Sequence, residues 1–119
     1  MTTTSAAIKY ADNTVAWAEK ELDLNQRQIG CAIGADRRTL YRWRRRKTAP
    51  SAQHRRNLEK LNELKYLFGT SFRSTEAAQR WLHTDVPDLR GRTPYFAIAQ
   101  GDLESVLQLL GTLQAGAFR

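Results

Sequence analysis

The chain has 119 residues, enough for one compact domain or two small ones, and it carries a formal net charge of +7 at pH 7. No apolar run approaches the length of a membrane span, and the N-terminus lacks the basic, apolar and cleavage regions of a signal peptide, so we expect a cytoplasmic protein. The single cysteine, Cys31, excludes an internal disulfide bond, and we expect it to be a buried or half-buried packing residue.

The N-terminal segment predicts one helix. We expect residues 1–10 to be mobile and a helix to begin at Asp12 or Asn13 and to end near Leu22. Three apolar residues of this segment share one helical face: Val15, Ala18 and Leu22.

Two helix starts and a glycine turn follow within residues 25–45. Asn25 is a good N-cap, and Gln28 stands three residues on, as in a capping box. Gly34 supplies a tight turn at positive φ, and Asp36 caps the next helix. This order predicts a helix-turn-helix, a motif that enters the major groove of DNA, although some domains of this fold bind only protein.

The second helix of the motif is predicted from Arg37 to about Arg46. Leu40 and Trp43 point inward, and Gly30 is small where the first helix must cross closely. The side chains expected to face base edges are Arg37, Arg38, Tyr41 and Arg42. The full set of expected DNA-binding residues is Asn25, Gln26, Arg27, Arg37, Arg38, Thr39, Tyr41, Arg42, Arg45 and Arg46, and Arg44 and Lys47 are further phosphate candidates.

The positive charge is concentrated in one segment. Residues 27–56 hold ten basic residues and one acidic residue, a balance of +9. Residues 1–26 have a balance of −2, and residues 57–119 are neutral. A charge run is usually a solvated face, but a phosphate-binding face also needs such a concentration, because affinity for duplex DNA comes largely from Lys and Arg displacing counterions.

The rest of the chain also predicts helices. Residues 50–68 form a long helix that begins at Pro50 and that Gly69 stops. N-capping residues begin three shorter helices, and glycines end the last two; these residues are Ser74, Thr93 (before Pro94), Gly101, Asp102 and Gly116. We therefore expect an all-α chain with a helix-turn-helix domain (1–49), a linking helix (50–69) and a C-terminal helical domain (70–119).

No group of residues predicts catalysis. The two histidines, His54 and His83, have no cysteine or histidine at metal-ligand spacing, so we expect no metal site. A phosphate-loop glycine pattern, a nucleophile elbow and a convincing catalytic triad are also absent from the sequence. The expectation is a protein that is not an enzyme and that uses no cofactor.

The C-terminal half resembles the toxin-binding domain of Xre/MbcA/ParS-type antitoxins. The resemblance rests on an ordered set of elements across about residues 57–119: Phe72, Ala77-Ala78, Trp81-Leu82, Pro87-Asp88-Leu89, Gly91, Thr93-Pro94, Gly101, Val106-Leu107, Leu110 and Gly116-Ala117-Phe118. Residues 95–98, Tyr-Phe-Ala-Ile, depart from the smaller aliphatic residues that the family more often carries there. The departure leaves open how this helix packs.

The resemblance implies an antitoxin of a type II toxin–antitoxin system. Such a protein binds a cognate toxin, usually a RES-type enzyme that consumes NAD or transfers ADP-ribose from it, and represses its own operon through its N-terminal domain. Its C-terminal end reaches the toxin's active-site cleft, which assigns toxin contact to Gln114, Gly116, Ala117, Phe118 and Arg119. An equally weighted alternative folds Phe118 back onto the chain's own last helix.

Two further expectations concern assembly. A single recognition helix reads few base pairs, so we expect a homodimer on two half-sites of double-stranded operator DNA. The alternative function is a stand-alone transcriptional repressor whose C-terminal half only dimerises.

Overall fold

The computed structural model describes residues 2–116, and every regular element in this range is helical. This confirms the all-α prediction. In chain order the elements are α1 (Thr2–Glu21), α2 (Gln26–Ile33), α3 (Arg37–Arg44), α4 (Ala52–Ser71), α5 (Thr75–Leu82), the 3₁₀ turn η1 (Pro87–Leu89), α6 (Pro94–Ala99) and α7 (Leu103–Gly116).

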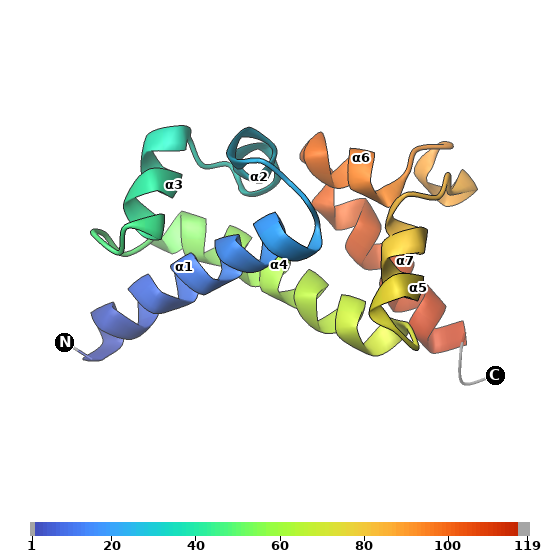
Figure 1. Cartoon of the computed structure of the whole chain (residues 1–119), viewed down its shortest axis with the longest axis horizontal. Helices are drawn as coiled ribbons and strands as arrows, with labels where there is room; N and C mark the ends of the chain where they lie inside the picture. Colours follow the sequence, from blue (N-terminus) through green and yellow to red (C-terminus); the bar gives the residue numbers. More distant parts are fainter. Residues whose placement is uncertain (1, 117–119) are drawn as a thin grey trace.

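The molecule is elongated, 46 × 26 × 24 Å, and α4 runs along much of its length (Figure 1). Helices α1 to α3 gather around the first part of α4, and α5 to α7 gather around its second part. The ion pair Lys60–Glu104 joins the middle of α4 to the start of α7, and the hydrogen bond Gln114–Thr70 joins the ends of the two helices. The two helices therefore run side by side in the same direction.

Helix-capping residues fix the boundaries that the sequence predicted best. The backbone N–H of Gln28 donates to Asn25 Oδ1 at 2.8 Å, and that of Asn25 donates to Gln28 Oε1 at 2.9 Å, which closes the capping box. Gly34 ends α2 at φ +70°, and the Asp36 side chain accepts from Thr39 N at 2.8 Å. The turn between α2 and α3 is thus the predicted one. Ser74 and Thr93 cap α5 and α6 in the same way.

Several predicted boundaries were wrong. Helix α1 begins at Thr2, ten residues or more before the predicted start; Ala11 extends its buried face, and the Tyr10 hydroxyl donates to the carbonyl oxygen of Leu58. Helix α3 ends at Arg44 rather than near Arg46, which has φ +55°.

Helix α4 also differs from its prediction at both ends. It begins after Ser51, whose hydroxyl accepts from His54 N, and not at Pro50. It continues through Gly69 to Ser71 because aromatic packing continues past the glycine: the rings of Phe68 and Phe72 lie 5.7 Å apart, edge to face.

The prediction for Cys31 was also wrong, because its side chain is exposed. Ile29 and Ile33, four residues apart, take the inward face of α2, so residue 31 lies on the opposite face. The backbone of Cys31, in contrast, is closely packed against Gly101. A Cβ added to Gly101 would lie 2.9 Å from the carbonyl oxygen of Cys31.

The two halves of the chain contact each other directly. Helix α2 packs on α6, and the amide of Gln28 donates to the Tyr95 hydroxyl at 3.2 Å. Tyr95 is half-buried, Ala97 and Ile98 are buried, and Phe96 is exposed, which answers how the departing segment packs. The proposed domain boundaries at residues 49 and 69 stay a prediction.

Gly30 allows α2 to lie against the turn that follows it. A Cβ at this position would lie 2.4 Å from the backbone oxygen of Ala35, closer than any real contact. We expect Gly30→Ala to destabilise the protein by about 1–3 kcal/mol, because the backbone must shift to relieve the overlap. Urea unfolding followed by circular dichroism measures this change.

Gly111→Ala is the matched control. Gly111 lies within α7, and a Cβ there would meet no atom within 4 Å. The substitution should stabilise the protein by up to about 1 kcal/mol through helix propensity. Equal stabilisation by both substitutions would contradict the close approach at Gly30.

Candidate functional site

Helix α3 presents one apolar and one basic face. Leu40 and Trp43 are buried, at 0% and 1% exposure, and they fix the helix on the core. The opposite face carries four exposed side chains: Arg37, Arg38, Tyr41 and Arg42. The Arg45 guanidinium lies 5.5 Å from the centre of the Tyr41 ring, a cation–π contact that orients both groups. The predicted base-reading residues therefore share one solvent-exposed surface.

The remaining predicted DNA-binding residues lie around this face. Arg27 is exposed in the first turn of α2, and Gln26 and Thr39 are half-buried. Asn25 is exposed, but its side-chain oxygen already accepts the capping hydrogen bond from Gln28 N. Its amide nitrogen is therefore the group that it could offer to a phosphate.

Two arginines at the end of α3 form ion pairs with α1. Arg44 Nη1 pairs with Asp12 Oδ1, and Arg46 Nε donates to Asp12 Oδ2 at 2.7 Å. Arg44 Nε also lies 3.1 Å from Glu19 Oε1. Asp12 and Glu19 are seven residues apart, so they lie on the same face of α1. Neither carboxylate was predicted from the sequence to pair with the arginines.

Among these charged residues, Asp12 is buried, with 7% of its surface exposed. Burial raises its pKa, but hydrogen bonds from Arg46 and Arg44 and their positive charges outweigh burial. The pKa of Asp12 consequently lies below the ordinary value for aspartate.

Acid should destabilise the fold through Asp12. Because its pKa is lower in the folded state than the unfolded value of about 3.9, Asp12 contributes stability above that pH. This contribution is lost as the pH falls through the folded-state pKa. Urea unfolding from neutral pH to about pH 2 should show a steeper loss for the wild type than for Asp12→Asn. Parallel pH profiles of the two proteins would contradict the assignment.

His54 lies at the junction of the basic segment and the core. Its ring packs edge-on against Trp43 at 5.3 Å, and its Nε2 lies 3.3 Å from the carbonyl oxygen of Gly34. The side chain is half-buried, so it supports the turn between α2 and α3.

The predicted toxin contacts lie at the end of α7. Gln114 is half-buried, and its Nε2 donates to Thr70 Oγ1 at 2.7 Å. Gly116 is the last residue of α7. The other three predicted contacts, Ala117, Phe118 and Arg119, lie outside the described residues.

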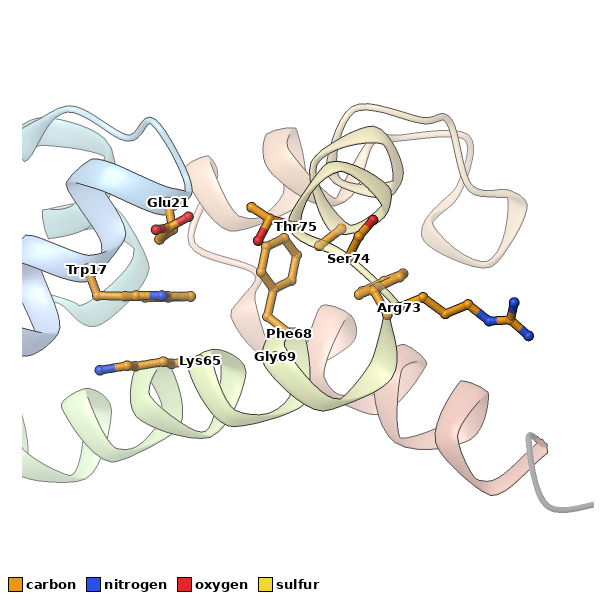
Figure 2. A pocket seen from close by; sticks show the side chains of 10 residues that line it. Trp17, Glu21, Lys65, Phe68, Gly69, Arg73, Ser74 and Thr75 are labelled. Atoms are coloured by element: carbon orange, nitrogen blue, oxygen red, sulfur yellow. The ribbon is translucent and has the colours of Figure 1, made fainter.

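A pocket of about 330 Å³ lies between α1, α4 and α5 (Figure 2). Aromatic rings form its inner wall, with Trp17 and Phe68 edge to face at 6.2 Å. Charged side chains stand among its other lining residues: Glu21, Lys65 and Arg73. The walls of this pocket come from segments far apart in the chain, so it was not predicted from the sequence.

Among residues 2–116, no group of three or more His, Cys, Asp or Glu side chains could hold a metal ion. Within the same range, no helix is long and apolar enough to cross a membrane.

Comparison with known proteins gives two matches. Residues 65–116 match the family model of the antitoxin Xre/MbcA/ParS C-terminal toxin-binding domain. One chain in the crystal structure of the M. tuberculosis MbcT–MbcA toxin–antitoxin complex has a similar fold, with 24% identity and a TM-score of 0.52 over 91% of this chain and 96% of that chain. A comparison with curated protein sequences finds no match. The resemblance predicted from the sequence is confirmed for residues 65–116, which match the Xre/MbcA/ParS antitoxin toxin-binding domain.

Proposed function

We propose that the chain is the antitoxin of a type II toxin–antitoxin system, that it neutralises a RES-type toxin by covering its active site, and that it represses its own operon. The match of residues 65–116 to a toxin-binding domain carries the first part of this proposal. The structurally similar chain comes from a toxin–antitoxin complex, which favours an antitoxin over a repressor that only dimerises. The toxin's chemistry, consumption of NAD or transfer of ADP-ribose, follows from the family resemblance.

The toxin-binding element in this proposal is the end of α7 and the tail after it. Gln114 and Gly116 belong to the helix, and residues 117–119 follow it. A phenylalanine in the segment after α7 can fill an apolar cleft, and Arg119 adds a guanidinium for polar groups there.

The DNA-binding part of the proposal rests on α3. A rigid helix, held by buried Leu40 and Trp43, exposes arginines that can pair with guanine edges and phosphates. The proposed set comprises the ten residues predicted from sequence: Asn25, Gln26, Arg27, Arg37, Arg38, Thr39, Tyr41, Arg42, Arg45 and Arg46. Of these, Arg46 is also paired with Asp12, which reduces what it can offer to DNA. As a homodimer in the cytoplasm, the protein would place two such helices on an operator with two half-sites. Light scattering that shows a monomer with and without DNA would contradict the dimer.

Co-expression with the neighbouring reading frame of the operon tests the main proposal. A tagged antitoxin should pull down the product of that frame, and cells that express both should grow where cells expressing the toxin alone do not. The operon's upstream DNA should shift in a gel with the purified protein. A neighbouring product that is neither bound nor neutralised would overturn the antitoxin assignment.

A further inference from the structure

We propose that Asp12 limits the sequence-independent affinity of the DNA-binding surface: its carboxylate holds Arg44 and Arg46 against α1 and so reduces their contacts with phosphates of any sequence. This inference rests on the proposed DNA-binding function.

The geometry gives Asp12 two charged partners on one neighbouring segment. Its two oxygens pair with different arginines, Oδ1 with Arg44 and Oδ2 with Arg46. Arg44 also forms an ion pair with Glu19. Both carboxylates lie on the same face of α1. The Arg44 side chain is 34% exposed, whereas Asp12 is almost wholly covered. The pair therefore belongs to the α1–α3 contact.

The electrostatic consequence follows from the charge of the motif. Arginine charge that contacts phosphates raises affinity for all duplexes alike, because it releases counterions independently of sequence. Arg44 and Arg46 stand at the end of α3, next to the exposed arginines that are expected to read bases. The Asp12 carboxylate neutralises the charge of these two residues and so lowers sequence-independent affinity for DNA. The side chains of Arg38 and Arg42 remain free to contact base edges. The affinity for every duplex and its dependence on salt are lower as a result, whereas the ratio of specific to non-specific binding stays the same.

Asp12→Asn tests this inference, because it removes the charge but keeps the shape of the side chain. Binding to a random-sequence duplex is measured by fluorescence anisotropy between about 50 and 200 mM salt. With Arg44 and Arg46 released, the slope of log affinity against log salt should steepen by about one to two, and binding at low salt should tighten. Affinity for the operator should rise by a similar factor, because phosphate contacts do not depend on sequence. A merely structural role would instead weaken binding to both duplexes.

Asp85→Asn is the control for net charge. Asp85 is exposed in the C-terminal half, away from α3. The substitution removes one negative charge, as Asp12→Asn does. A slope for Asp12→Asn equal to that for Asp85→Asn would overturn the inference.

Arg44→Gln keeps the inference testable if Asp12→Asn does not fold. Because Arg44 already binds Asp12 and Glu19, its loss should leave the salt slope of non-specific binding unchanged. A slope that becomes shallower by about one would show that Arg44 contacts phosphate in the wild type and would overturn the inference. A wild-type protein that binds neither duplex at low salt would instead overturn the proposed DNA-binding function.

Discussion

Replacing Arg38 and Arg42 together with alanine should abolish operator binding and leave toxin neutralisation intact. Both side chains are exposed on α3, and each is expected to contribute about 1–3 kcal/mol by contacting a base edge. Loss of both should weaken the operator complex by about thirtyfold to about twenty-thousandfold. Anisotropy titration of the operator at fixed salt measures the change, and a reporter of the operon's promoter should become derepressed in cells.

A double substitution in the other half separates this effect from the loss of charge. Arg73→Ala with Arg80→Ala also removes two exposed arginines, but from the segment around α5, and should leave most operator affinity in place. Circular dichroism should show the same helix content in both proteins. Operator binding that survives the loss of Arg38 and Arg42 would contradict the assignment of α3 as the reading helix.

The parts of the fold that the sequence predicted correctly are those with local causes. An N-cap and its partner three residues away, as at Asn25 with Gln28, act within one turn of helix. Gly34 likewise takes the positive φ that its turn requires. The residues that make such contacts are close together in the sequence. They can therefore be read before any tertiary contact is known.

The missed features depend on contacts between distant residues. Gly69 is a plausible helix stop by itself, yet α4 passes through it because Phe72 packs on both Phe68 and Trp81. Asp12 looked like a helix start, and its partner Arg44 lies 32 residues away. No local pattern distinguishes an aspartate that begins a helix from one that binds arginines across the fold. The pocket between α1, α4 and α5 could not be predicted either, because its lining residues are distant in the sequence.

Truncation after Leu113 should abolish or strongly weaken toxin neutralisation and spare DNA binding. The deletion removes Gln114 to Arg119, the residues proposed to occupy the toxin's cleft, but keeps the buried part of α7, which ends at Leu110. The basic motif is unchanged, so operator affinity should stay within about twofold of the wild type. Growth of cells that express the toxin measures neutralisation, and a pull-down measures binding.

The deletion also removes the hydrogen bond from Gln114 to Thr70, so Thr70→Ala is the matched control: it loses that bond and keeps the tail. Full neutralisation by Thr70→Ala together with failure of the truncated protein would locate inhibition in the tail itself. If the truncated protein protects cells as well as the full chain, the tail is not the inhibitory element. A helical face must then bind the toxin. Val106 is fully buried and Trp81 is half-buried, whereas Phe96 exposes 51% of its surface, so α6 would be the next face to mutate.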